Sequence, residues 1–171
     1  MGRFEVVLGD ITKQDADAIV NAANCSLLGG GGVDGAIHRA AGPELLEECR
    51  ALHGCETGQA KITKGYRLKA KYVIHTPGPI WRGGGKNEEG LLRSCYANCL
   101  RLASENGCKS VDFPSISTGV YHFPLDKAAK IAVETICAYL KKHPELEQVR
   151  IVCFDENTRR YYAEALDGVK K

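Results

Sequence analysis

The stretch GGGGVDGAIH, residues 29–38, joins four glycines to the start of a predicted helix and decides how the rest of the chain is interpreted. Glycines that open a helix place backbone N–H groups where they can bind an anion, because a helix N-terminus carries a partial positive charge. Asp34 lies inside this segment, so a carboxylate accompanies a site that attracts negative charge. The alternative is a flexible surface loop, although ordering four glycines for no purpose would cost considerable chain entropy.

Apolar segments and helical patterns alternate on both sides of this stretch. Short apolar runs predict strands at residues 3–9, 16–23, 59–68, 71–79, 109–117 and 148–155. Helical periodicity and terminal signals predict helices at residues 33–42, 43–54, 87–107, 124–144 and 158–168. This alternation predicts an α/β fold, a sheet with helices on both faces. No linker, repeat or low-complexity tract interrupts the chain, which predicts one domain over residues 1–171.

The composition argues against several functional classes. Lys and Arg number 23 against 21 Asp and Glu, so no basic stripe requires a nucleic acid, and we expect no nucleic-acid sequence recognition. The N-terminal residues lack an apolar leader segment, and no run approaches the roughly 20 apolar residues that cross a bilayer. We therefore expect a cytoplasmic protein with no membrane partner.

The eight cysteines are scattered, without a CxxC pair, which argues against a disulfide framework and suits a reducing compartment. Cys95 and Cys99 share one face of a predicted helix. Without histidines or further cysteines at ligand spacing, they predict packed thiols rather than a zinc site. We expect no metal and no cofactor.

Ligands of open α/β sheets bind outside the carboxyl ends of the strands. Three predicted loops lie there, at residues 9–12, 21–35 and 114–124. Gly30, Gly32 and Gly35 match the dinucleotide pattern GxGxxG, but the preceding strand ends near Ala23, too early for the tight turn that this pattern needs. The chain also lacks the GxxxxGK[ST] pattern of a P-loop.

Each loop also carries polar groups suited to a nucleotide-like ligand. In SISTGVY, residues 115–121, small residues let backbone N–H groups approach a phosphate, and Ser117 and Thr118 can donate to it. A turn packed by its tyrosine is the alternative. Asp10 in GDIT can accept from an adenine amine or cap a helix. Asn21 and Asn24 in NAAN can bind sugar hydroxyls or form turns.

Taken together, GDIT, NAAN followed by GGGGVDGAIHRAAG, and PSISTGVY resemble the macrodomain family, specifically its MacroD-type branch of ADP-ribose-binding hydrolases. The resemblance runs from about residue 4 to the last predicted helix. It implies a three-layer α/β/α sandwich around a mixed sheet, with ADP-ribose bound in a cleft.

The resemblance also implies roles for individual residues. Asp10 would take the adenine amine, the backbone of Ile11 would line the adenine pocket, and Phe154 would stack on the adenine, with core packing as the alternative for Phe154. Tyr121 would lie against the distal ribose. Two backbone walls would enclose the diphosphate, formed by Gly32 and Val33 on one side and by Ser117, Thr118, Gly119 and Val120 on the other. Ala22 and Gly31 would be further ligand-binding residues.

Asn24 and Asp34 match the pair associated with catalysis in this branch, which implies hydrolysis of an ester at the distal ribose. A neighbouring diphosphate would raise the pKa of Asp34 toward the range of a base. His38, one helical turn later, would support Asp34, with a histidine of no such role as the alternative. His75 is expected to be a satisfied strand-end residue. His122 replaces an expected glycine and is expected to face solvent, with a side chain that narrows the cleft mouth or reaches a substrate group as the alternative.

The implied partners are ADP-ribose, its O-acyl esters and mono-ADP-ribosylated proteins, with O-acetyl-ADP-ribose or ADP-ribose on acidic side chains as substrates. Two alternatives use the same cleft: a module that binds ADP-ribose without cleaving it, and a phosphatase acting on a phosphomonoester of ADP-ribose. The Asn24 and Asp34 pair favours the ester hydrolase.

Overall fold

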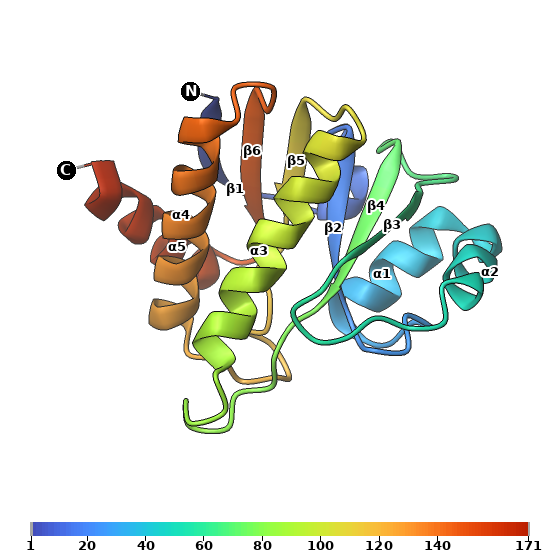
Figure 1. The fold of residues 1–171 in the computed structure, drawn as a ribbon, viewed down its shortest axis with the longest axis horizontal. Coiled ribbons are helices and arrows are strands. Elements are labelled where there is room, and N and C mark those ends of the chain that lie inside the picture. Colours follow the sequence, from blue (N-terminus) through green and yellow to red (C-terminus); the bar gives the residue numbers. More distant parts are fainter. Residues whose placement is uncertain (1, 171) are drawn as a thin grey trace.

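A computed structural model describes residues 2–170 and shows a sheet covered by helices on both faces (Figure 1). Each predicted strand and helix is present, with shifts of a few residues at the ends. The chain runs through β1 (Arg3–Leu8), a short 3-10 helix η1 (Ile11–Lys13), β2 (Ala18–Ala23), α1 (Gly32–Ala41), α2 (Pro43–Ala51), β3 (Lys61–Lys64), β4 (Tyr72–Pro77), α3 (Glu88–Glu105), β5 (Ser110–Phe113), α4 (Leu125–Lys142), β6 (Gln148–Cys153) and α5 (Glu156–Lys170).

The sheet has six strands in the order β1-β6-β5-β2-β4-β3. Every neighbouring pair is parallel except β3 and β4, which are antiparallel and joined by a turn in which Gly65 N donates to Lys71 O at 2.9 Å. The predicted mixed sheet is therefore confirmed, and its single antiparallel strand lies at an edge.

Successive side chains of each strand point to opposite faces of the sheet, and both faces are buried. Val20 and Ile74 belong to the larger core, which packs against α3, α4 and α5. Their neighbours Ile19 and Val73 belong to a second core, which packs against α1 and α2. The result is the predicted α/β/α sandwich.

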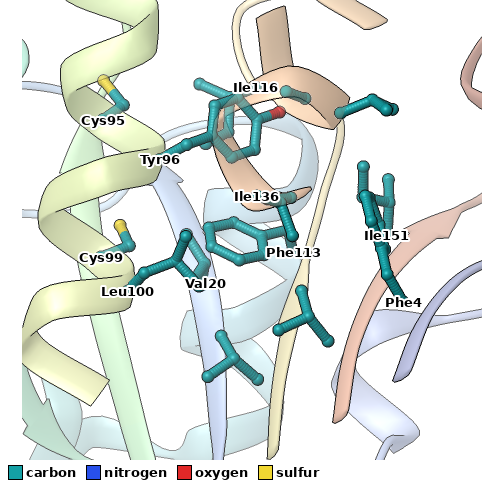
Figure 2. Packing of buried hydrophobic residues seen from close by; sticks show 14 of the residues in the cluster. Phe4, Val20, Cys95, Tyr96, Cys99, Leu100, Phe113, Ile116, Ile136 and Ile151 are labelled. Carbon is teal, nitrogen blue, oxygen red and sulfur yellow. The ribbon is translucent and has the colours of Figure 1, made fainter. Parts of the chain in front are cut away.

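The larger core contains the cysteines that could have suggested a metal site. Cys95 and Cys99 are fully buried on α3, beside Tyr96, whose ring centroid lies 5.1 Å from that of Phe113 (Figure 2). Cys95 Sγ lies 3.5 Å from the Pro77 carbonyl oxygen, and burial raises the pKa of this thiol to about 11. The prediction of packed thiols is confirmed.

The five parallel strands end at one edge of the sheet, the lower edge in Figure 1. At this edge β2 and β5 are the least tightly joined neighbours, because they pair only at Ala18 with Val111 and at Ile19 with Asp112. The loops that follow these two strands are therefore not tied to each other by sheet hydrogen bonds. Within residues 2–170, no helix combines the length and the apolar character needed to cross a membrane.

Candidate active site

The strand order sets the order of the predicted loops along the carboxyl edge. Asp10 follows β1 and Phe154 follows the adjacent β6, where Gly9 N donates to Cys153 O at 2.9 Å. Phe154 is 84% exposed, so core packing, the alternative considered for it, is wrong. An exposed aromatic ring and a carboxylate thus lie on neighbouring strand ends, an arrangement suited to an adenine.

Asp10 caps η1, and only one of its carboxylate oxygens is used. Oδ1 accepts from the backbone N–H of Thr12 at 2.9 Å and from its hydroxyl at 2.7 Å. These hydrogen bonds, the hydroxyl first, lower the pKa of Asp10 despite a small opposing effect of burial. Both interpretations of Asp10 are compatible, since capping occupies Oδ1 while Oδ2 can accept from an amine.

The glycine loop that follows β2 leads into α1, and its backbone forms one wall of the candidate site. Gly31 is the N-cap residue, and α1 begins at Gly32. The backbone N–H groups of Gly31, Gly32 and Val33 have no hydrogen-bond acceptor among the described residues, as expected for a helix N-terminus. A Cβ added at Gly31 or Gly32 would meet no atom within 4 Å, so this wall has open space in front of it.

The loop after β5 forms the opposite wall, and here the sequence prediction needs a correction. Ser117 Oγ is buried and would lie 2.2 Å from a Cβ added at Gly78, so the hydroxyl points into the protein. The Thr118 hydroxyl bonds Ser115 Oγ at 2.6 Å. The Ser117 hydroxyl therefore does not face outward as expected for a phosphate donor, and the Thr118 hydroxyl is hydrogen-bonded within its own loop.

The second wall nevertheless offers backbone donors. Across residues 2–170, the backbone N–H groups of Gly119, Val120 and Tyr121 have no hydrogen-bond acceptor. Gly119 has open space around it, and Val120 is 85% exposed. Two sets of unbonded N–H groups therefore follow β2 and β5, and both suit an anion such as a diphosphate.

Asn24 holds the start of the glycine loop in shape. Its Nδ2 donates to Gly29 O at 2.8 Å, and its Oδ1 accepts from Ser26 Oγ at 2.6 Å and from Leu27 N at 3.1 Å. Asn24 is therefore a turn former, as one interpretation expected. The second hydrogen on Nδ2 remains able to bind a ligand, so the sugar-binding interpretation survives as well.

Asp34 lies in the first turn of α1, and its carboxylate turns inward. The residue is only 4% exposed, and Oδ1 accepts from Asn21 Nδ2 at 2.9 Å. His38 Nε2 lies 3.4 Å from the same oxygen, so the structure brings the two predicted residues together. Burial raises the pKa of Asp34, while Asn21 and then His38 oppose that rise. The predicted direction is right, but burial, rather than a neighbouring diphosphate, causes it in the free protein.

The side chains of Asp34 and Asn24 both lie close to Gly30. A Cβ added at Gly30 would lie 3.2 Å from Asp34 Oδ2 and 3.4 Å from Asn24 Nδ2. The two predicted catalytic side chains therefore flank one point beneath the glycine loop. Oδ2 faces this point, while Oδ1 faces Asn21.

Sequence reasoning misplaced Asn21 and His75. Asn21 is fully buried inside β2, on the face that carries Ile19, and so it is neither a turn former nor a sugar ligand. His75 is fully buried inside β4 rather than at its end, and it is the sheet partner of Asn21. The available signal was the two-residue period of the strands, which places Asn21 on the same face as Ile19.

A cavity of about 570 Å³ lies beside the Asn24 loop. Its lining includes Cys25, which follows Asn24, and Tyr121, which was predicted to contact the distal ribose. The Tyr121 carbonyl accepts from Trp81 N at 2.9 Å, which ties this wall to the loop after β4. The cavity therefore adjoins the end of the site that carries Asn24.

Glu88 shapes the far rim of this cavity, and sequence reasoning did not single it out. Its buried carboxylate accepts from the backbone N–H groups of Arg82, Gly84 and Lys86, at 2.8, 2.9 and 2.6 Å. Burial alone would raise the pKa of Glu88, but these hydrogen bonds lower it to about 2. A glutamate just after a glycine-rich loop was the signal for this arrangement.

Three further features concern the site and its surroundings. His122 is exposed with a φ of 59°, a left-handed conformation in which glycine is favoured, in agreement with the expectation of glycine at this position. Residues 2–170 contain no group of three or more His, Cys, Asp or Glu side chains that could hold a metal ion. A second surface groove, between α4 and α5, is lined by none of the predicted site residues.

Comparisons with known proteins agree with this geometry. The family model described as Macro domain matches residues 20–132. A Macro domain-containing protein from Lactiplantibacillus plantarum is 62% identical over 167 residues, which cover 97% of each chain. An O-acetyl-ADP-ribose deacetylase from Salmonella newport is 54% identical over 168 residues, which cover 96% of this chain and 94% of its own.

Solved structures extend the comparison to the fold. The Oceanobacillus iheyensis macrodomain with ADP has a TM-score of 0.93 and 46% identity, covering 96% of this chain and 90% of its own. A variant of that macrodomain with ADPR has a TM-score of 0.93 and 45% identity, covering 97% of this chain and 93% of its own.

Proposed function

The chain belongs to the macro domain family, and we propose that it binds ADP-ribose and hydrolyses esters at the distal ribose. The proposed reactions are deacetylation of O-acetyl-ADP-ribose and removal of mono-ADP-ribose from acidic side chains of proteins. The observation that carries the proposal is that the side chains of Asn24 and Asp34 both lie close to Gly30. Two sets of backbone N–H groups without a hydrogen-bond partner lie on the neighbouring loops. The relative described as an O-acetyl-ADP-ribose deacetylase supports it.

The strand order gives the proposed ligand one direction along the edge of the sheet. The adenine lies at the ends of β1 and β6, against Asp10 and Phe154. The diphosphate lies between the loops after β5 and β2, where the unbonded N–H groups can bind it. The distal ribose then reaches Asn24, Asp34 and Tyr121, beside the cavity of about 570 Å³.

In the proposed deacetylation, a water attacks the carbonyl carbon of the acetyl ester while Asp34 Oδ2 takes its proton. The bond between that carbon and the ribose oxygen then breaks, and the proton passes to the ribose oxygen, giving acetate and ADP-ribose. A carboxylate with a raised pKa is a better base for this step than an ordinary exposed one. Asn24 orients the ribose, and correct orientation alone is worth several kcal/mol of barrier.

The test follows loss of O-acetyl-ADP-ribose over time with the native chain and with Asp34→Ala, together with calorimetric binding of ADP-ribose to each. We expect the native chain to cleave the ester. The variant should still bind ADP-ribose but cleave at least about a hundredfold more slowly, because it lacks the base.

The same assay separates the alternatives. A native chain that binds ADP-ribose yet leaves both O-acetyl-ADP-ribose and ADP-ribosyl-glutamate intact would be a binding module, with Asp34 only a ribose contact. Release of inorganic phosphate from a phosphomonoester of ADP-ribose, without deacetylation, would identify the phosphatase. The cytoplasmic location stays a prediction.

A further inference from the structure

A chain of buried hydrogen bonds connects Asp34 to the interior of the sheet. Asn21 Nδ2 lies 2.9 Å from Asp34 Oδ1 and 3.1 Å from His75 Nδ1. On the other side of the His75 ring, Nε2 lies 2.9 Å from Thr63 Oγ1. All four residues are buried, and they come from α1, β2, β4 and β3. The steps of the proposed reaction use neither Asn21 nor His75.

The geometry fixes where the hydrogens lie. The amide nitrogen of Asn21 carries two hydrogens, one directed at Asp34 and the other at His75, so His75 Nδ1 must accept. The proton of a neutral His75 ring is therefore on Nε2, which donates to Thr63 Oγ1. The Thr63 hydroxyl in turn donates to Lys64 O at 3.1 Å. Every donor in the chain has an acceptor.

His75 is suited to remain neutral. Burial, together with the neighbouring His38 ring at 6.4 Å, lowers the pKa of His75 to about 3. A protonated ring would place a hydrogen on Nδ1 facing the hydrogen of the amide. A reversed amide would place its oxygen against the carboxylate of Asp34 and the lone pair of Nδ1. His75 thus holds the amide of Asn21 with its nitrogen toward Asp34.

The arrangement leaves one polar atom without a partner. Asn21 Oδ1 is buried and has no hydrogen-bond partner among the described residues. An unpaired buried carbonyl costs stability, and the two hydrogen bonds of Asn21 Nδ2 to buried acceptors offset that cost. An apolar residue at this position would leave Asp34 Oδ1 without this donor, so the amide acts on the carboxylate as well as on packing.

We propose that Asn21 is the positioning residue of Asp34, kept in its donor orientation by His75. Asn21 holds Oδ1, so Oδ2, which faces Gly30 and Asn24, is the oxygen that takes the proton in the reaction. This inference rests on the proposed hydrolase function. Neither Asn21 nor His75 touches the ligand, because both are fully buried.

Few titratable groups face this network. His38 from α1 faces both Asp34 and His75. Cys49 from α2 lies 3.8 Å from His75 Nε2, and burial raises the pKa of its thiol to about 11, so it stays neutral. The titratable groups that face the network are therefore Asp34, His38 and a neutral Cys49.

The first experiment compares Asn21→Ala with the native chain on O-acetyl-ADP-ribose. We expect kcat to fall about 10- to 100-fold, with KM within about threefold, because a misplaced base slows chemistry more than binding. The acid limb of the pH profile should move to higher pH, since the lost hydrogen bond had lowered the pKa of Asp34. His75→Gln should also move the acid limb of the pH profile to higher pH, but by a smaller amount than Asn21→Ala.

Asp112→Asn is the matched control. Asp112 is equally buried in β5, where it accepts two hydrogen bonds from Arg150, and it makes no contact with Asp34. Its loss should weaken the fold while leaving the acid limb in place. An acid limb that stays unmoved in Asn21→Ala, or that moves equally in Asp112→Asn, would overturn the proposal.

A measurement without catalysis keeps this proposal separate from the proposed function. In protein with ¹⁵N-labelled histidine, the His75 ring should show hydrogen on Nε2 and none on Nδ1 from about pH 5 to 8. In ¹³C-labelled protein, the Asp34 carboxyl should titrate at higher pH in Asn21→Ala than in the native chain. Protonation of Nδ1 in that range, or an unchanged Asp34 midpoint, would refute the positioning role. A native chain that leaves the ester intact, with both NMR results as expected, would refute only the hydrolase.

Discussion

Gly30 is the point at which the structure makes the sharpest prediction about the chemistry. A Cβ at this position would lie 3.2 Å from Asp34 Oδ2 and 3.4 Å from Asn24 Nδ2, closer than the optimum of about 3.5–4.0 Å for nonbonded contacts. The φ of Gly30 lies outside the left-handed region, so alanine would bring no backbone strain. Gly30→Ala should therefore act by pressing on the two predicted catalytic side chains.

The size of the effect follows from the two close contacts. Overpacking costs about 1–3 kcal/mol, and the side chains can relieve part of it by moving a few tenths of an ångström. An increase of about 1–2 kcal/mol in the activation barrier corresponds to a kcat about 5- to 30-fold lower. The calorimetric affinity for ADP-ribose should change little, because the ligand-facing N–H groups of Gly31 and Gly32 are untouched.

Gly31→Ala is the matched control, since its Cβ would enter open space in front of the N-terminus of α1. That space is where the diphosphate is proposed to bind, so this variant should raise the Kd for ADP-ribose and the KM more than it lowers kcat. Steady-state rates on O-acetyl-ADP-ribose and calorimetry separate the two outcomes. A native kcat in Gly30→Ala would refute the placement of the chemistry at this point.

The remaining predictions concern the adenine, the neighbour of Asp34 and the buried histidine. Phe154→Ala should weaken ADP-ribose binding by about 1–3 kcal/mol in calorimetry with kcat unchanged, because the ring is exposed and stacking is its proposed role. His38→Ala should lower kcat about 10-fold at neutral pH, and an unchanged rate would remove the supporting role. His75 has a pKa of about 3 in the folded chain against about 6.5 when unfolded, so the unfolded state binds more protons between these values. The free energy of unfolding, from urea titrations, should therefore fall as pH drops below about 6.5, by up to about 1.4 kcal/mol per unit from this residue. That part of the slope should vanish in His75→Gln.

Local patterns were enough to predict the fold because each element carries its own signals. Val20 and Ile74 lie in short apolar runs, which suit parallel strands buried on both faces. Pro43 at the start of α2 and Asn106 after α3 marked helix ends where the structure has them. These signals act within a few residues, and so they can be read along the chain without knowledge of its packing.

Local patterns did not predict where the polar side chains of the site point. Ser117 and Thr118 belong to a loop whose hydroxyls were expected to face a phosphate, yet the Ser117 hydroxyl packs against Gly78 and the Thr118 hydroxyl bonds Ser115. The pairing of Asn21 with His75 joins residues 54 apart, and it follows from the register of β2 and β4, which no short motif contains. Side-chain direction at the site depends on tertiary contacts, whereas backbone placement depends on the local sequence.

This distinction explains why a carboxylate can lie beside a site for an anion. The helix N-terminus presents its backbone N–H groups outward, whereas Asp34, in the same first turn, points its carboxylate into the protein. Burial raises the pKa of Asp34 before any ligand is present, and the donor from Asn21 limits that rise and holds one oxygen. A diphosphate bound at the helix N-terminus would raise the pKa further by like charge. The backbone N–H groups that can bind the anion and the carboxylate that acts as the base thus point to opposite sides of the glycine loop. Because they point in different directions, both can belong to one short segment.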